Sequence, residues 1–275
     1  MNGTKPIKQQ SIKKEYLWGT EEWILSYLHE GFEDVPLLVK KITAREALSV
    51  QVHPNDAYAK EHEGSLGKTE MWYVLDCEPG AYLYYGLKHQ ISENEFKKRI
   101  QNGSITEVCK KVYVKKGDVF YIPAGVIHAI GKGITILEVQ QSSNITYRIY
   151  DYQREDANHQ KRELHIKQAS EICGFQPLLQ GHRPMGLCRK KEGYHEMLLV
   201  QCPYFTVYHY QIKTCLQYHH TTGFSYIYVV SGEGSLETDK ETVSLRAGDS
   251  YFLPENIENY EIKGNIEIVM SEVAR

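Results

Sequence analysis

Two stretches with the same spacing decide the fold: Gly117-Asp-Val-Phe-Tyr-Ile-Pro123 and Gly248-Asp-Ser-Tyr-Phe-Leu-Pro254. Each begins with Gly-Asp, continues through apolar and aromatic residues, and ends in proline. Turn residues at both ends of a short apolar run are typical of a β-strand. Because the pattern recurs once, far along the chain, it indicates two related β domains rather than a solenoid of short repeats.

Length and charge limit the classes of protein that this chain can be. It has 275 residues and a formal net charge of -3, which suits one large domain or two medium ones. Without a basic surplus we expect no nucleic-acid partner. The polar, lysine-rich N-terminal residues and the lack of a long apolar run predict neither a signal peptide nor a membrane anchor. The six cysteines form no C-x-x-C pair, and we interpret them as reduced thiols of a cytoplasmic protein.

The pattern along the chain predicts a mainly β protein with a few short helices. The 21 tyrosines favour strands. Residues 48–53 alternate as a strand does, and many further apolar runs lie between turn signals. Residues 92–102 are predicted to form a short helix, because Ser92 and Glu95 have the spacing of a capping box. Residues 165–172 are predicted to form another.

This reading divides the chain into three parts. Residues 1–173 form an N-terminal domain, residues 174–195 a linker or crossover without periodicity, and residues 196–275 a C-terminal domain. Frequent turn signals in the last part indicate a barrel or a sandwich.

The first repeat continues into a pattern that points to metal chemistry. It runs on as Pro123-Ala-Gly125-Val-Ile-His128, which resembles the second motif of cupin barrels, where the histidine is a metal ligand. The resemblance implies two jelly-roll-like cupin β-barrel domains. Gln51 and His53 lie two apart on one strand face, and Glu70 begins the next strand. Because inward side chains of neighbouring strands converge in a small barrel, these residues predict a four-ligand site.

Each of these side chains also has an ordinary explanation when it is taken alone. A single histidine is more often structural, and a single carboxylate is more often solvated. Their combination with the glycine–proline motif favours a metal site. Imidazole and carboxylate ligands suit zinc, while iron, manganese and nickel stay open on ligand type alone.

Four segments in order carry a more specific resemblance: LSVQVHPND, GKTEMWYVLD, GDVFYIPAGVIHAIGKG and LEVQQSSNITYRIYDY. They are similar to the signature segments of type I phosphomannose isomerases, also called mannose-6-phosphate isomerases, over roughly residues 36–170. The resemblance implies one zinc ion per chain, with the ligands Gln51, His53, Glu70 and His128. It also implies catalytic roles for Arg148 and Lys68 and substrate binding by Ser49, Lys68 and Arg148.

These residue types suit an aldose–ketose isomerase that interconverts mannose 6-phosphate and fructose 6-phosphate through a cis-enediol. Such a reaction needs an electrophile for the developing negative charge and a base for the proton. Arg148 is a permanent cation for phosphate or enediolate, unless it forms a salt bridge with Asp151 or Asp156. Lys68 could anchor phosphate or, with a depressed pKa, transfer a proton. The base and the oligomeric state stay open.

Two other functions compete with this hypothesis. One is a non-catalytic cupin that binds a sugar phosphate, and the other is a cupin enzyme with another substrate, such as a different hexose phosphate or the substrate of an oxygenase. The full set of Lys68, Glu70 and Arg148 argues against a simple binder. The Q-x-H pattern argues against oxygenases, which more often carry H-x-H on that strand.

The chain departs from the family pattern in two places. Its N-terminal region is short, with only residues 18–31 corresponding to a longer β segment, and the large helical insertion of longer members is missing. The second repeat has Asn256 for the glycine, Asn259 for the ligand histidine and Ser225 for the ligand glutamate. We therefore expect a degenerate C-terminal cupin without metal.

Overall fold

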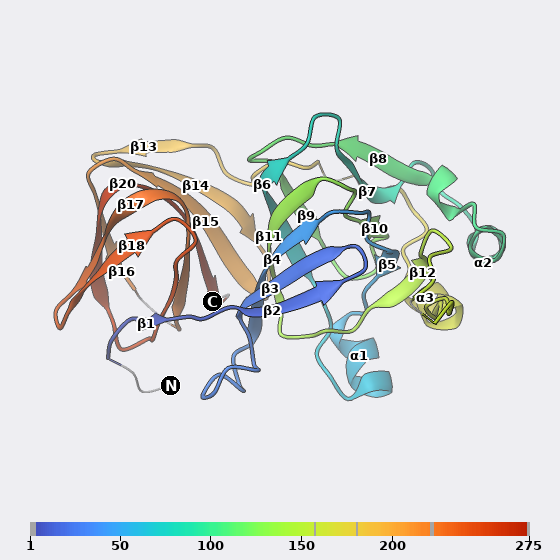
Figure 1. The fold of residues 1–275 in the computed structure, drawn as a ribbon, viewed down its shortest axis with the longest axis horizontal. Coiled ribbons are helices and arrows are strands. Elements are labelled where there is room, and N and C mark those ends of the chain that lie inside the picture. Colours follow the sequence, from blue (N-terminus) through green and yellow to red (C-terminus); the bar gives the residue numbers. More distant parts are fainter. Residues whose placement is uncertain (1–3, 157, 180, 221–222, 274–275) are drawn as a thin grey trace. The chain divides into compact units, whose positions relative to one another are not determined.

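The computed structural model describes residues 4–156, 158–179, 181–220 and 223–273. The chain is mainly β in these ranges, as the sequence predicts, and its strands form three sheets with antiparallel pairing (Figure 1). It divides into two compact units. One unit comprises residues 13–22 and 40–182, and the other comprises residues 1–12, 23–39 and 183–275. No helix within the described ranges is long and apolar enough to cross a membrane.

The unit that contains residues 40–182 is built on two sheets. The six-stranded sheet has the order β2-β3-β4-β11-β6-β9, and the five-stranded sheet has the order β12-β5-β10-β7-β8. The strands of the first sheet are β2 (Ile12–Tyr16), β3 (Gly19–Leu25), β4 (Leu37–Ala44), β6 (Glu70–Cys77), β9 (Val119–Ile122) and β11 (Ile134–Gln141). Those of the second are β5 (Val50–Val52), β7 (Tyr82–Leu87), β8 (Cys109–Tyr113), β10 (His128–Ala129) and β12 (Tyr147–Tyr150).

Two hydrophobic clusters hold these sheets in place. The first joins the facing sides of both sheets, with Trp72 and Phe120 from one and Leu83 and Tyr85 from the other. The second lies on the opposite face of the five-stranded sheet and includes Val50, Val52 and Ile149 together with side chains of two helices. Val50 and Val52 of β5 are thus buried on one face of the strand, whereas Gln51 on the other face is half-buried; burial of this kind is the main stabilising term for the strands that carry the site.

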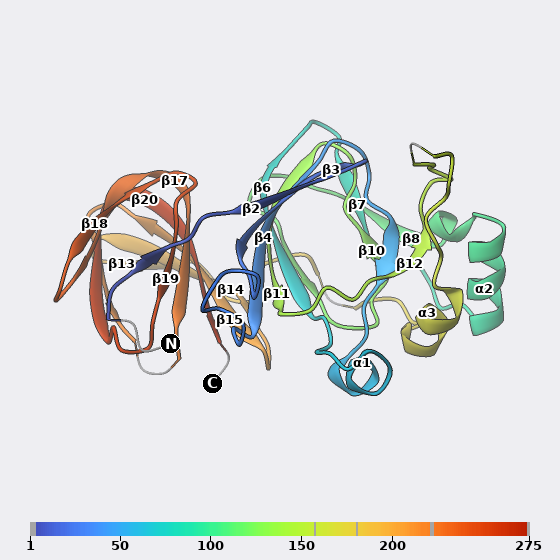
Figure 2. The same cartoon turned by 60° about the horizontal axis from the view of Figure 1, so that its bottom comes forward.

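Three α-helices and one short 3-10 helix are present in the part of the chain that the structure describes. They are α1 (Asp56–Glu63), α2 (Glu93–Gln101), η1 (Ile105–Glu107) and α3 (Ile166–Ile172). The predicted helices at 92–102 and 165–172 are confirmed, and the Ser92 side chain accepts a hydrogen bond from the Glu95 N–H, as a capping box requires. Figures 1 and 2 show α3 beside β12.

The other unit is built around one nine-stranded sheet. Its main path is β1-β19-β17-β20-β15-β14-β13, with β16 paired to β20 and β18 paired to β17. The strands are β1 (Ile7–Lys8), β13 (Arg189–Lys191), β14 (Tyr194–Gln201), β15 (Phe205–Ile212), β16 (Cys215–His219), β17 (Ser225–Thr238), β18 (Thr242–Arg246), β19 (Ser250–Leu253) and β20 (Asn259–Val273). A cluster of buried Ile, Leu, Val and Tyr side chains forms its core.

These units differ from the expected division of the chain at two points. Residues 1–12 and 23–39 belong to the unit with residues 183–275, because β1 pairs with β19 and Phe32 packs edge-on against Phe252, with 4.9 Å between ring centroids. The segment expected as a linker also contains β13 and the start of β14. Pairing partners far away in sequence, rather than local pattern, decide both differences.

Candidate metal centre and adjoining pocket

Three buried side chains converge at one point between neighbouring strands. His53 directly follows β5, Glu70 begins β6, and His128 begins β10. One ligand atom from each lies within 4.8 Å of the others, and all three side chains are buried. The strand ladder explains the convergence in part, since β10 pairs with β5 so that His128 lies opposite Gln51.

Hydrogen bonds to the backbone fix how both imidazoles are turned. The Nδ1–H of His53 donates to the Ile145 carbonyl at 2.8 Å, and the Nδ1–H of His128 donates to the Val126 carbonyl at 2.9 Å. Each ring therefore points an Nε2 lone pair at the centre of the site. The two Nε2 atoms are 3.1 Å apart and lie 3.6 and 3.3 Å from the carboxylate oxygens of Glu70.

Burial sets the protonation of this cluster. It lowers the pKa of His128 from 6.5 to about 4 and lowers the pKa of His53 well below 6.5. Burial, followed by repulsion from Glu138, raises the pKa of Glu70 to about 7. Both Glu70 oxygens are buried, and Oε2 lies 3.1 Å from the Nζ of Lys68. Two imidazole lone pairs facing such a carboxylate form a donor set that fits a divalent transition metal.

Gln51 lies at the edge of this cluster. Its Nε2 is 3.4 Å from the Nε2 of His128, and a half-turn of the amide would bring the oxygen to the same place. An amide oxygen is a donor to a metal, whereas the amide nitrogen is not. Three of the four predicted ligands thus converge in the cluster, and the Gln51 amide lies beside His128.

Lys68 and Glu138 are two further buried charged residues close to Glu70. The Nζ of Lys68 lies 3.1 Å from Glu70 and 3.9 Å from Glu138, and Glu138 also accepts a hydrogen bond from the indole of Trp72. Burial disfavours the charge on Lys68, but Glu70 and Glu138 outweigh burial and raise its pKa. The depressed pKa that would let Lys68 transfer a proton is therefore not found, and Lys68 acts as a cation.

Sequence reasoning missed two buried charges of this site. Lys40 in β4 is 2 % exposed, Glu138 in β11 is 3 % exposed, and the two lie 3.3 Å apart. Burial opposes the charge on Glu138, but Lys68 and then Lys40 lower its pKa. The available signal was one charged residue inside an apolar strand, since such a charge is seldom buried without a partner or a function.

A pocket of about 280 Å³ adjoins the cluster. All the residues predicted to contact substrate line it, namely Ser49, Lys68 and Arg148. Further lining side chains were not predicted: Glu21, Lys40, Glu138, Asn144, Thr146 and Arg162. Four cationic side chains face two anionic ones in this lining, so the pocket is suited to a small anion.

Arg148 projects into this pocket from β12. Its Nη1–H donates to the Glu163 carbonyl at 3.1 Å, and its Nε is buried without a hydrogen-bond partner. Burial, followed by the charge of Arg162, lowers its pKa from 12.5. The alternative that Asp151 neutralises Arg148 is not supported, because Asp151 bonds Arg154 and Arg162 instead.

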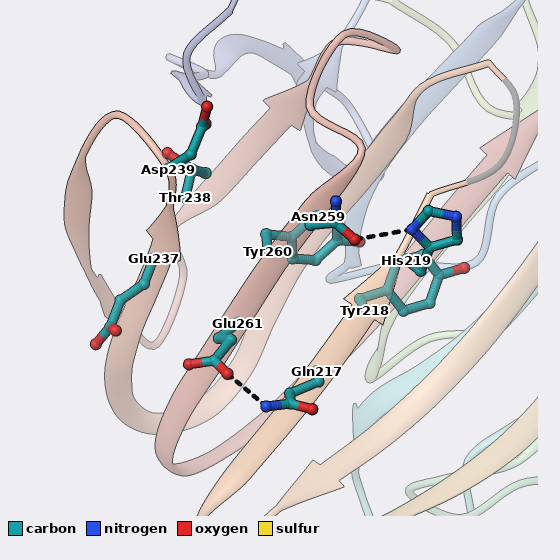
Figure 3. A pocket seen from close by; sticks show the side chains of 9 residues that line it. All are labelled: Gln217, Tyr218, His219, Glu237, Thr238, Asp239, Asn259, Tyr260 and Glu261. Carbon is teal, nitrogen blue, oxygen red and sulfur yellow. Dashed lines mark hydrogen bonds between the residues drawn. The ribbon is translucent and has the colours of Figure 1, made fainter.

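The second repeat contains a different arrangement (Figure 3). A pocket of about 470 Å³ is lined by residues of β16, β17 and β20, where His219 pairs with Asn259 at 2.8 Å and Gln217 donates to Glu261. Asn259 is exposed, whereas the next residue, Tyr260, is buried and its hydroxyl lies 3.4 Å from Ser225. Asn259 is thus exposed, unlike the buried His128, and the neighbouring Tyr260 is the residue that lies in the core of this unit.

Comparisons with known proteins agree with this reading. A family model described as "Mannose-6-phosphate isomerase, cupin domain" matches residues 195–273. The chain is 42% identical to a mannose-6-phosphate isomerase of Streptococcus mutans over 86% of this chain and 73% of the relative. It is 37% identical to the mannose-6-phosphate isomerase ManA of Bacillus subtilis over 94% of this chain and 80% of the relative.

The fold gives the same result. A crystal structure of the mannose 6-phosphate isomerase from Bacillus subtilis superposes with a TM-score of 0.89 and 30% identity, covering 97% of this chain and 99% of that one. The sequence likeness extends over most of both chains. The chain belongs to the type I mannose-6-phosphate isomerase family of the cupin superfamily.

Proposed function

We propose that this chain is a zinc-dependent aldose–ketose isomerase that interconverts mannose 6-phosphate and fructose 6-phosphate. The observation that carries the proposal is the direct adjacency of two features. A buried His-Glu-His cluster with the geometry of a metal site borders a small pocket whose charged lining is mostly cationic. The identity of the substrate is inferred from the names of the relatives, and the pocket is the place where it would bind.

One zinc ion per chain would be held by Gln51, His53, Glu70 and His128. The ion would supply a Lewis acid and a template that orients the two substrate oxygens at C1 and C2. The protein fixes the two imidazoles through their Nδ1 hydrogen bonds, which is the usual way in which ligand rings are oriented.

The phosphate of the substrate is assigned to the arginine side of the pocket. Arg148 lines this side and supplies a guanidinium for a charged oxygen. Arg162 lines the same pocket and is held by two hydrogen bonds to Asp151, at 2.7 and 2.6 Å. Guanidinium groups match phosphate oxygens in pairs, and Ser49 adds a hydroxyl to the lining.

Glu138 is our candidate for the base that moves the proton between C1 and C2. It is a buried carboxylate on the pocket wall, with Lys40 at 3.3 Å and Lys68 at 3.9 Å from its Oε1. Lys68 and Lys40 hold it ionised, so it can accept a proton at neutral pH. Lys68, which stays protonated, is suited to stabilise the negative charge that develops on the cis-enediol intermediate.

We also propose that each unit is a cupin of the jelly-roll type and that only the unit with residues 40–182 carries metal. The match of the cupin-domain model to residues 195–273 supports the first part. The second part is supported by Asn259 and Ser225, which stand where the repeat pattern would place a ligand histidine and a ligand glutamate.

A panel of substrates tests the proposed activity. Purified zinc-loaded protein is offered mannose 6-phosphate, glucose 6-phosphate and unphosphorylated mannose, with fructose 6-phosphate or fructose detected by coupled enzymes. We expect turnover of mannose 6-phosphate well above the other two. Equal or faster turnover of glucose 6-phosphate would assign another hexose phosphate as substrate, and no turnover at all would leave a binding protein.

A further inference from the structure

The backbone of Arg148 is held from the side that faces away from its sheet. β12 is the edge strand of the five-stranded sheet and pairs only with β5. The Arg148 N–H donates to the Nδ1 of His165 at 3.1 Å, and the His165 N–H donates to the Arg148 carbonyl at 2.8 Å. One histidine thus satisfies both polar backbone groups of Arg148, which an edge strand would otherwise leave open.

The same segment also holds the side chain of Arg148. The guanidinium donates from Nη1 to the Glu163 carbonyl at 3.1 Å. Three hydrogen bonds from residues 163–165 therefore fix the residue at both ends of its flexible side chain. The Arg148 side chain lines the pocket, so the N–H groups of the guanidinium that do not contact Glu163 are left for a ligand there.

His165 is itself anchored by the fold. It precedes α3 at the N-cap position with φ -99 and ψ 59, but its side chain makes no cap to that helix. Its ring lies 5.9 Å from that of Tyr147, centroid to centroid. Ala169 of α3 belongs to the same buried cluster as Ile149 of β12. An N-cap side chain usually accepts a hydrogen bond from the first turn of its helix. The His165 side chain accepts one from the Arg148 N–H instead.

We propose that His165 is a positioning residue for Arg148, fixing the direction in which the guanidinium enters the pocket. The inference rests on the proposed function, in which Arg148 binds the phosphate or the developing enediolate. His165 touches no substrate in this scheme. It acts through Arg148, because a small displacement of the guanidinium would strongly lower what Arg148 contributes to binding and turnover.

The hydrogen bond also requires one form of the ring. Nδ1 accepts only when it carries no proton, so His165 must be neutral with its hydrogen on Nε2. Burial lowers the pKa of His165, Arg148 lowers it further, and Glu163 and Glu63 oppose both effects. Tyr147, the other neighbour, bonds Glu63 through its hydroxyl. In the neutral range the ring is thus in the accepting form.

Substitutions that move the acceptor test the proposal. In H165N the amide oxygen replaces Nδ1 at the same distance from the backbone, whereas H165Q keeps a polar side chain but moves the acceptor one atom outward. H165A removes it. H89A, at an exposed histidine of the same unit, is the matched control. Each variant is assayed for zinc content, kcat, KM and affinity for mannitol 6-phosphate, an unreactive analogue, by calorimetry.

We expect H165A and H165Q to lose about 10- to 100-fold in kcat/KM and about 10-fold in affinity for mannitol 6-phosphate, with zinc content unchanged. H165N should stay within about 3-fold of the wild type in both, and H89A should equal it. Wild-type affinity in H165Q would overturn the proposal, and so would equal losses in H165N and H165Q. If H165A does not fold, the comparison of H165N with H165Q decides.

The calorimetric readout separates this inference from the function on which it rests. Should the wild type turn over no hexose phosphate, the proposed activity fails. The affinities for mannitol 6-phosphate would still show whether His165 positions Arg148.

Discussion

At the scale of single residues, the imidazole of His128 is the side chain most clearly arranged to bind a metal. Its Nδ1 is bonded to the Val126 carbonyl, and its Nε2 faces Glu70 and His53. Replacing His128 by alanine removes one of four donors, so we expect the variant to retain less than about a tenth of the wild-type zinc and to lose about 100-fold or more in kcat. Metal analysis and the coupled isomerase assay measure both.

The matched control for His128→Ala is His219→Ala in the other repeat. His219 is exposed and bonds only Asn259 among the contacts the structure gives it. We expect its zinc content and activity to stay at wild-type levels. Loss of zinc in His219→Ala, or full activity in His128→Ala, would contradict the assignment of the metal to residues 40–182.

Glu138 allows a test that separates proton transfer from metal binding. Glu138→Gln keeps the shape and the hydrogen bond from Trp72 but cannot accept a proton, so we expect kcat to fall about 10²- to 10⁴-fold with zinc content unchanged. Glu46→Gln, at an exposed carboxylate paired with Lys132, is the control, and its kcat and zinc content should equal those of the wild type. A Glu138→Gln enzyme with more than a third of the wild-type kcat would exclude Glu138 as the base.

Asp151 gives a prediction on stability and pH. Burial opposes its charge, but Arg162 and Arg154 outweigh burial and lower its pKa below 3.8. The stabilisation is therefore complete above pH 3.8 and is lost only as the pH falls through the lower, folded pKa. We expect Asp151→Asn to cost about 2 kcal/mol in urea unfolding, equally at pH 7 and pH 5. A cost that is already halved at pH 5 would contradict the lowered pKa.

At the scale of elements, the start of β6 depends on a close contact with the start of α1. A Cβ on Gly67 would lie 2.5 Å from the backbone carbon of Asn55. Gly67→Ala should therefore push Lys68 and Glu70 away from their places, with a loss of about 2 kcal/mol or more in unfolding free energy and weaker zinc binding. Gly174→Ala, where a Cβ has ordinary space, is the control. Equal melting temperatures for the two variants would contradict this packing.

The elements also show what the sequence could and could not reveal. Helix α2 could be predicted from Ser92 and Glu95, because capping is a local interaction. Helix α1, of which Asn55 is the N-cap, was not predicted, because Asn and Asp occur both in turns and at N-caps. Gly232 and Gly264 lie inside the long strands β17 and β20, where close strand neighbours leave no room for a Cβ.

At the scale of the whole molecule, the predicted substrate and metal residues lie together because one strand ladder and its neighbours bring them there. Their spacing in short motifs made them recognisable without a structure. Lys40, Glu138 and Arg162 were not recognised, because their importance arises only when β4, β11 and the segment after β12 fold around the pocket. The hydrogen bond between Arg148 and His165 was likewise not predictable, because only the fold brings these two residues together.

The two repeats differ in a way that the alignment of the sequences did not reveal. The sequence singles out Asn259 and Ser225 as departures from the ligand pattern. The structure adds that Tyr260 turns inward toward Ser225 and fills the interior with an aromatic ring. The loss of donors and the gain of packing explain why we assign metal to one unit.

Titration of metal-stripped protein with zinc tests the central claim most directly, because it measures metal stoichiometry and isomerase activity in one experiment. Stripped protein receives zinc in steps, and the conversion of mannose 6-phosphate to fructose 6-phosphate is followed after each step. We predict that activity starts near zero, rises linearly and stops rising at one zinc per chain. Full activity without zinc, or a rise that continues to two ions per chain, would contradict the account.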